Sequence, residues 1–356
     1  MSTSCKVLGA FIPTVLIVTL AVSPALADPI TWHGPIGPAS NVDKLAIDPL
    51  HQGTLYAAAA NGMFKTIDGG TNWEDLNFHQ RVSALVIDPH TPDTLYAAGE
   101  FAAYASVFKS TDGGNHWSRA DAGIDYRRAD VPTLIIDPNA PGTLYISTNT
   151  PAGNVHKSTD GGAYWNPLPW IDQTLRERVI ATALAIDPRN SAILYAGTAY
   201  GVYKSTDGGN HWTRKITGFV DTSVSVLLID PLNSSKIYAG MDDTGIFVSV
   251  DGGDHWNPIN NGLPNLPGPY RILDLTTVSR FPSLLYAALL YSCVFESADG
   301  GNHWNNTGLY NPFTLAVDAH NPVTIYAGTP QGVFLGETGL TWNPTNWVYL
   351  PMLTRQ

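Results

Sequence analysis

Regularly spaced aspartates are the residues of this 356-residue chain whose chemistry most needs an explanation. The nine residues KSTDGGNHW occur twice, at Lys109 to Trp117 and at Lys204 to Trp212. A carboxylate with a histidine four residues later could serve as an acid–base pair or as metal ligands. Looser copies of this stretch bring the central aspartates to six, spaced 44 to 48 residues apart: Asp68, Asp112, Asp160, Asp207, Asp251 and Asp299.

A structural role for these aspartates fits their number better than catalysis does. Six near-equal copies indicate a task that every repeat shares, whereas a catalytic site is usually built once. Glycine supplies positive φ angles in tight turns, and an Asp carboxylate accepts hydrogen bonds from N–H groups of its own turn. We therefore assign the aspartates, with His116, His211 and His303, to turns. No metal site is expected, because separate repeats would hold the histidines far apart.

A second marker runs in phase with the first. The stretch LAIDP (Leu45 to Pro49) and five copies of it give six repeats, and a tyrosine follows eight residues after each aspartate. In a further repeat Val278 replaces the aspartate, which makes seven units. Each unit contains four short strand patterns, the first of them apolar throughout and expected to be buried on both faces. The sequence therefore predicts an all-β fold, a seven-bladed β-propeller of four-stranded antiparallel blades.

Two stretches depart from this pattern. Residues 171–184 (IDQTLRERVIATAL) have the one helical periodicity of the chain and suggest a short helix. The stretch PITWHGPIG around Trp32 resembles the start of a fourth strand. We expect it to complete the last blade, beside a worn seventh repeat that ends at Trp342, and so to join the chain ends.

Residues 1–27 read as a signal peptide, because an apolar run is followed by Ala25-Leu26-Ala27 before Asp28. An uncleaved anchor is the alternative. We expect residues 28–356 to be a single domain exported to the periplasm or outside the cell. No later run is long enough to span a membrane, and Cys293 is left without a disulfide partner in the mature chain.

Charge limits the partners of the mature protein. The chain has 19 Lys and Arg against 30 Asp and Glu, a net charge of −11. This balance disfavours nucleic acid and anionic lipid as partners. We expect a monomer that needs no cofactor or metal and takes a protein or carbohydrate ligand.

The variable loops opposite the Asp-Gly-Gly turns are the expected binding region, since binding residues concentrate on loops of rigid scaffolds. The residue seven places before each Asp-Pro aspartate is expected at the mouth of the central channel. These residues are Asn41, Arg81, Asp130, Ile180, Ser223, Arg271 and Asn311. We predict that Arg81 and Arg271, with Arg127 and Tyr270 nearby, bind a polar or anionic group. The simpler interpretation is that solvated loop ends are polar.

A glycoside hydrolase would need two carboxylates across the mouth, about 5 to 9 Å apart. The candidate pairs join Asp130 to Asp43, Asp172 or Asp274.

The run Ser/Thr-x-Asp-x-Gly-x-x-x-Trp resembles the Asp-box, or bacterial neuraminidase repeat, over residues 41 to 345. The same repeat occurs in sialidases, xyloglucanases, sortilin-type receptors and photosystem II assembly factors. A resemblance to sialidases would imply a cluster of arginines, of which the stretch PYRIL (Pro269 to Leu273) carries a faint trace. A resemblance to xyloglucanases would imply two propellers that face each other. Sortilin-type receptors need more blades and a Cys-rich extension. Photosystem II assembly factors match best in size, blade number and export.

The resemblance to these assembly factors implies a binding protein without catalytic residues. We therefore expect a binding or assembly scaffold. A glycoside hydrolase acting at the channel mouth is the alternative, and a purely structural role in the cell envelope stands third.

Overall fold

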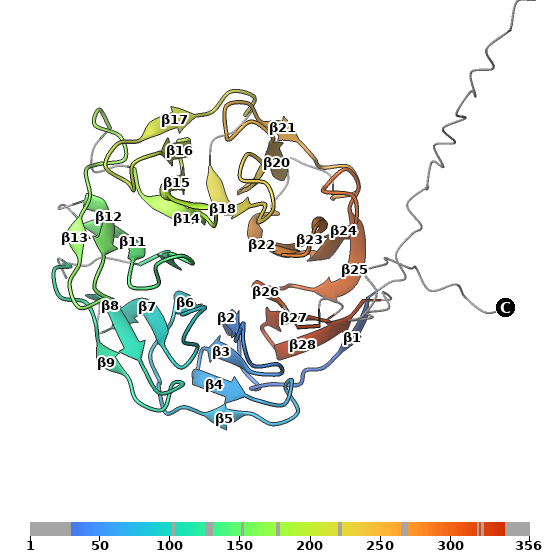
Figure 1. The fold of residues 1–356 in the computed structure, drawn as a ribbon. Helices are drawn as coiled ribbons and strands as arrows, with labels where there is room; N and C mark the ends of the chain where they lie inside the picture. The colour runs from blue at the N-terminus through green and yellow to red at the C-terminus, as the bar shows by residue number, and fades with distance from the viewer. Residues whose placement is uncertain are drawn as a thin grey trace, which may run out of the picture.

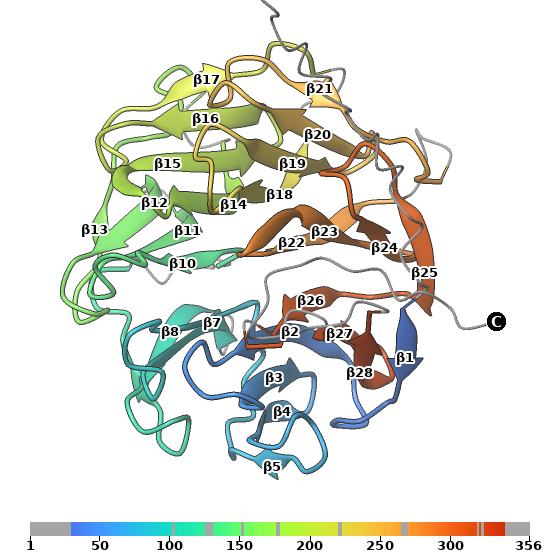
Figure 2. The same cartoon turned by 45° about the vertical axis from the view of Figure 1, so that its right-hand side comes forward.

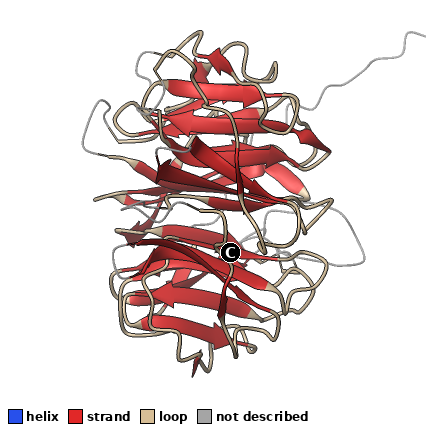
Figure 3. Cartoon of the chain, turned by 90° about the vertical axis from the view of Figure 1, so that its left-hand side faces the viewer, coloured by secondary structure: helices blue, strands red, loops and turns tan. Residues whose placement is uncertain are grey.

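A computed structural model describes residues 30–338 except 102–103, 125–130, 151–152, 176–178, 220–222, 265–269, 319 and 322–323. Seven four-stranded antiparallel sheets surround a central axis, like the blades of a propeller (Figure 1). In side view the described residues form strands and loops, with no helix among them (Figure 3). The predicted seven-bladed β-propeller is confirmed.

Within blades 1 to 6 the strands follow chain order from the axis to the rim. Blade 1 contains β2 (Val42–Ile47), β3 (Leu55–Ala59), β4 (Gly62–Thr66) and β5 (Glu74–Asp75). Blade 2 contains β6 (Ala84–Ile87), β7 (Leu95–Phe101), β8 (Tyr104–Ser110) and β9 (Ser118–Arg119). Blade 3 contains β10 (Leu134–Ile136), β11 (Leu144–Thr150), β12 (Gly153–Ser158) and β13 (Asn166–Pro167).

The second half of the ring repeats this order. Blade 4 contains β14 (Ala181–Asp187), β15 (Asn190–Thr198), β16 (Gly201–Ser205) and β17 (Thr213–Lys215). Blade 5 contains β18 (Val224–Ile229), β19 (Ile237–Met241), β20 (Ile246–Ser249) and β21 (Asn257–Pro258). Blade 6 contains β22 (Ile272–Val278), β23 (Phe281–Leu289), β24 (Cys293–Ser297) and β25 (Asn305–Tyr310). Blade 7 contains β26 (Thr314–Val317), β27 (Thr324–Thr329), β28 (Gly332–Glu337) and β1 (Thr31–His33).

The start of the described chain closes the ring, as expected from the PITWHGPIG stretch. Strand β1 pairs with β28, with Trp32 opposite Gly336 (Figure 2). The indole Nε1 of Trp32 also donates a hydrogen bond to Thr307 Oγ1 of blade 6, at 3.2 Å. Blade 7 therefore combines three strands from the end of the described chain with one strand from its start.

Two sequence-based expectations need correction. The suggested helix at residues 171–184 is wrong where the chain is described, because Ala181 to Leu184 belong to strand β14. The inner strands are not buried on both faces either. In β2, Val42 and Leu45 are buried, but the residues between and after them are partly exposed. Each inner strand contacts the inner strands of both neighbouring blades, as β2 does with β26 and β6, and its unpaired edge lies toward the axis, which leaves some of its residues partly exposed.

Each Asp-Gly-Gly turn is stabilised by its own side chains. Asp112 Oδ1 accepts hydrogen bonds from Ser110 Oγ at 2.8 Å and from the His116 N–H at 2.9 Å. His116 Nδ1 lies 2.6 Å from Asp112 Oδ2, and Gly113 and Gly114 adopt φ angles of 69° and 93°. Equivalent contacts recur around Asp207 and Asp251. The aspartates are therefore committed to the local turn structure.

The same turns also join one blade to the next through a tyrosine and a lysine, a contact that we call the inter-blade latch. The Tyr195 hydroxyl and the Lys204 ammonium, both of blade 4, donate to the Gly252 carbonyl of blade 5 at 3.0 and 2.9 Å. The Lys204 ammonium also lies over the Tyr195 ring, 5.4 Å from its centroid. Equivalent tyrosine hydroxyls bind the turn of the next blade in three other places, Tyr96 to Gly161, Tyr238 to Gly300 and Tyr326 to Gly69.

The tryptophan that ends each turn packs toward the preceding blade. Trp165 and Trp304 are almost fully buried. The indole Nε1 of Trp165 donates to the Ala120 carbonyl, and that of Trp304 to the Ile259 carbonyl, both at 2.7 Å. These two indoles therefore add apolar area and one directed bond each between neighbouring sheets, whereas the Nε1 atoms of Trp117, Trp212 and Trp256 have no hydrogen-bond partner among the described residues.

Acid should weaken the fold through these turns. Hydrogen bonds from the residue four positions on lower the pKa of Asp112 and Asp207 to about 2, below the usual 3.8. A lowered folded-state pKa gives stability that is present above pH ~4 and lost as the pH falls toward ~2. We expect denaturant midpoints to fall over this range, and the double substitution Asp112→Asn, Asp207→Asn to flatten the dependence. An unchanged acid profile in the double variant would contradict the assignment.

The hydrogen bond from a tyrosine hydroxyl to the next blade should contribute stability that depends on the length of the bond. Tyr195→Phe should lower the free energy of unfolding by about 1 kcal/mol, the usual net value of one hydrogen bond. Tyr238→Phe is the matched control, since its hydroxyl lies 3.5 Å from the Gly300 carbonyl and should lose less. Equilibrium unfolding in urea measures both, and an equal loss in the two variants would argue against the latch.

Candidate functional site

A cavity of about 350 Å³ lies on the propeller axis, and all seven blades contribute to its wall. Its charged residues are Asp43 and Lys44 of blade 1, Arg81 of blade 2 and Arg271 of blade 6. The inner strands β2, β6, β10, β14, β18, β22 and β26 bring these residues together from across the sequence (Figure 1). The ring thus gathers residues as far apart in the sequence as Asp43 and Arg271, which are 228 positions apart.

The residue five places before each Asp-Pro aspartate, or its equivalent, lines this cavity. These residues are Asp43, Ser83, Pro132, Thr182, Ser225, Leu273 and Phe313. In four blades this residue is the one skipped by the strand register, as in the shift between Val42 and Lys44. Such a β-bulge redirects a side chain. Of the residues seven places before the aspartate, Arg81 and Arg271 line the cavity among those that the structure describes.

The hydroxyl groups of the wall hold neighbouring blades together. Ser83 Oγ lies 2.6 Å from the Val131 carbonyl, and Ser225 Oγ lies 2.7 Å from the Ile272 carbonyl. Thr182 Oγ1 makes the same kind of bond to the Val224 carbonyl. These donors are therefore engaged within the protein, and the charged residues are the groups best able to bind a ligand.

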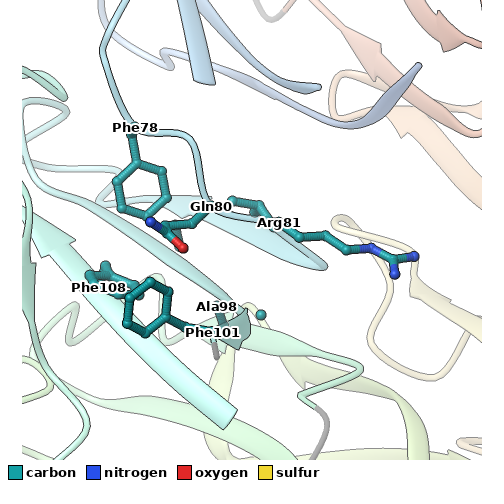
Figure 4. Close-up of a pocket in the computed structure, with 9 residues that line it drawn as sticks. Phe78, Gln80, Arg81, Ala98, Phe101 and Phe108 are labelled. Carbon is teal, nitrogen blue, oxygen red and sulfur yellow. The ribbon is translucent and has the colours of Figure 1, made fainter. Parts of the chain in front are cut away.

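The two arginines of the cavity differ in their partners. Arg271 Nε lies 2.8 Å from Asp242 Oδ1, and Asp242 in turn accepts a hydrogen bond from Ser223. No hydrogen bond or ion pair from Arg81 is seen within the described parts of the chain. Figure 4 shows the Arg81 side chain extending away from the aromatic cluster of Phe78, Phe101 and Phe108, which surrounds a pocket of about 10 Å³. Arg81 is therefore the more available cation.

The carboxylates of the channel lie in a low-dielectric wall. Burial raises the pKa of Asp43 above its usual value, although Arg81 and Lys44 oppose the shift. Burial also raises the pKa of Asp274, with Lys44 opposing. Asp274 Oδ2 accepts hydrogen bonds from the Leu315 N–H at 2.8 Å and from Thr314 Oγ1 at 3.1 Å. Asp274 thus connects blades 6 and 7, and Asp43 is the carboxylate that faces the cavity.

The other residues proposed from sequence lie around this centre. Asn41 is exposed, and its carbonyl accepts a hydrogen bond from the Ala60 N–H. Tyr270 is partly buried against the blade 6 core. Asn311 has a φ of 58°, and its N–H donates to the Ser292 carbonyl. Ile180 and Ser223 are partly buried, whereas Arg127 and Asp130 lie outside the described residues.

Asp172 serves a loop rather than the channel. Its Oδ1 accepts hydrogen bonds from the Thr174 and Leu175 N–H groups, and its Oδ2 accepts one from the Tyr203 hydroxyl at 3.0 Å. The Thr174 hydroxyl contributes most to lowering the pKa of Asp172 to about 2. Asp172 is therefore an unsuitable catalytic acid near neutral pH.

Within the described part of the chain, no three His, Cys, Asp or Glu side chains gather as metal ligands would. No described helix has the length and apolar character needed to cross a membrane.

Comparison with solved structures places this fold among large and small propellers. The GH74 xyloglucanase from Xanthomonas campestris is 18% identical with a TM-score of 0.69, covering 86% of this chain and 53% of the enzyme. GH74 from Niastella koreensis is 19% identical with a TM-score of 0.66, covering 84% and 52%. The chain thus spans about half the length of these enzymes.

A smaller propeller matches over nearly its whole length. YCF48, in a structure described as bound to D1 peptide, is 17% identical with a TM-score of 0.63, covering 89% of this chain and 98% of YCF48. No family model and no curated protein matches the sequence. At these identities the likeness establishes the fold and not the activity.

The different partners of the two arginines predict different costs of removal. Arg271→Ala should lower the free energy of unfolding by up to about 1 kcal/mol, because it leaves Asp242 without its cation in a partly exposed pair. Arg81→Ala should change it by less than about 0.5 kcal/mol, as for surface residues outside any network. Chemical unfolding of both variants tests this order, and a larger loss for Arg81→Ala would refute it.

Proposed function

We propose that this protein is an exported, non-catalytic binding scaffold of the Asp-box repeat class, whose channel mouth takes an anionic group of a protein partner. Residues 1–27 would be removed on export to the periplasm or the cell exterior. Residues 28–356 would then act as one monomeric domain, without a cofactor or metal. The contacts between blades would make the ring a rigid frame, and the residues at the channel mouth would contact the partner.

The balance of charges in the central cavity carries this proposal. Arg81, Arg271 and Lys44 face it together with the carboxylate Asp43, and Asp242 balances the charge of Arg271. Arg81 and Lys44 therefore remain against the one carboxylate that lines the cavity. Guanidinium groups bind carboxylates through paired hydrogen bonds, and Arg81 has its donors uncommitted among the described residues. Within a protein of net charge −11, this is a local cationic centre suited to an acidic segment.

Two observations support a protein as the partner. The wall hydroxyls that could grip a sugar are bonded to neighbouring blades. YCF48, which matches over nearly its whole length, is described in complex with a peptide. A partner segment entering the mouth would present a side-chain or terminal carboxylate to Arg81 and Arg271.

A glycoside hydrolase is the second candidate, favoured by the likeness to GH74 xyloglucanases. Asp43 has a raised pKa, as a general acid requires. The described residues supply no second carboxylate facing the cavity, since Asp274 is bonded to blade 7 and Asp172 to its own loop. The binding role is therefore the better-supported function.

Labelled acidic peptides test the proposal, with sequence-matched amide peptides (Asp to Asn, Glu to Gln) as controls. We expect acidic peptides to bind in fluorescence anisotropy, more weakly at higher salt, and Arg81→Ala to weaken binding about tenfold through one lost charged contact. Lys65→Met, which alters an inter-blade contact away from the mouth, is the control variant. Release of reducing sugars from xyloglucan that Asp43→Asn abolishes would establish the hydrolase instead.

A further inference from the structure

A carboxyl group is buried at the interface between blades 6 and 7. Glu296 of β24 is 4% exposed, and strand register pairs it with Tyr286 of β23, which is fully buried. Blade 6 therefore has an acidic side chain at a position where other blades have a basic one. In blades 1 to 4 the residue paired with the corresponding tyrosine is a lysine: Lys65, Lys109, Lys157 and Lys204.

The tyrosine paired with Glu296 belongs to an apolar cluster that blades 6 and 7 share. Val294 of blade 6 and Leu315 and Ile325 of blade 7 are among its members. The Tyr286 hydroxyl donates a hydrogen bond to Glu296 Oε1 at 3.2 Å. No cation forms an ion pair with Glu296 within the described residues. Ionisation in place would therefore leave a buried charge with only a neutral hydroxyl beside it.

The strands packed around Glu296 bring few other titratable groups. Strand β26 has none, and Tyr310 at the end of β25 is 61% exposed. Tyr326 of β27 packs against blade 1 instead. His33 of β1 and Glu337 of β28 lie 3.7 Å apart, and both are more than half exposed. Uptake of a proton at this interface is therefore governed by Glu296 itself.

The other carboxyl groups of blades 6 and 7 have stronger partners. Burial raises the pKa of Asp274, but Lys44 and two hydrogen bonds from β26 favour its ionised form. Asp318 accepts a hydrogen bond from the His320 N–H at 2.8 Å. Burial raises the pKa of Glu296 to about 7, and the hydrogen bond from the Tyr286 hydroxyl opposes the shift. Glu296 is thus the carboxyl group of this interface that changes charge near neutral pH.

We propose that protonated Glu296 keeps blades 6 and 7 packed together and that its ionisation loosens this interface, so that closure of the ring responds to pH. A neutral carboxyl group is tolerated in an apolar interface, whereas a carboxylate without a cation gains free energy by reaching water. Blade 7 is also the blade that β1 completes, so the same interface adjoins the junction between the two ends of the described chain. This response is independent of any ligand at the channel mouth.

The direction of the pH effect follows from linkage. A glutamate pKa of 4.5 in water and about 7 in the closed ring gives stability that is complete below pH ~4.5 and lost as the pH rises through ~7. The Asp-Gly-Gly turns behave in the opposite way, since they lose stability in acid. The interface between blades 6 and 7 should therefore be tightest in mild acid.

Hydrogen exchange followed by mass spectrometry tests the proposal, with rates corrected for the intrinsic pH dependence of exchange. Where exchange reports the opening equilibrium, protection of β26 and β27 should fall about tenfold from about pH 6 to about pH 8. Glu296→Gln stays neutral and should show no such fall. Glu337→Gln alters an exposed glutamate of blade 7, and this control should behave as the wild type.

Equal protection of β26 and β27 at the two pH values in the wild type would overturn the proposal, and this comparison needs no variant. The same fall in Glu296→Gln would overturn it as well, because another group would then be responsible. A fall of equal size in β11 and β12 of blade 3 would also refute it, since the whole ring would be unfolding. Acidic-peptide binding at the channel mouth is a separate measurement, and its failure would leave this result unaffected.

Discussion

The carbonyl of the first turn glycine is the acceptor on which the ring depends. In blade 5, Gly252 belongs to a turn whose Asp251 is fixed by Ser249 and His255, and the same Gly252 carbonyl receives Tyr195 and Lys204 from blade 4. One short turn therefore fixes the conformation of its own sheet and the contact of that sheet with the preceding blade. Because successive blades depend on the same geometry, the turn residues repeat while the loops on the opposite face do not.

At the mouth the connection between blades is made by hydroxyl groups instead. Ser83, Thr182 and Ser225 donate across to backbone carbonyls at or just before the start of the following inner strand. A small hydroxyl can reach the neighbouring backbone without filling the channel, which leaves the space that the charged side chains share. The cavity thus lies where the inner strands are joined, and its charged side chains come from blades 1, 2 and 6.

Sequence periodicity predicted the blades, the strand order and the closing strand at Trp32, because each depends on local patterns of apolar residues and turn glycines. The identity of the residues that line the cavity was less predictable. Asp43, Thr182, Ser225 and Leu273 face the cavity because the register skips one residue there, and a skipped residue leaves no mark in an alternating pattern. The helical spacing of residues 171–184 misled for a similar reason, since β14 also begins with a bulge, between Ala181 and Ala183.

Blade 6 departs from the repeat at the position of the inter-blade lysine. The lysine of the inter-blade latch becomes Glu296, which is buried against the Tyr286 hydroxyl with its pKa raised by burial to about 7. The sequence of blade 7 has Thr338 and Gly339 where other blades have Asp-Gly-Gly, so that lysine would have no standard turn to bind. Strand β1 closes blade 7 instead.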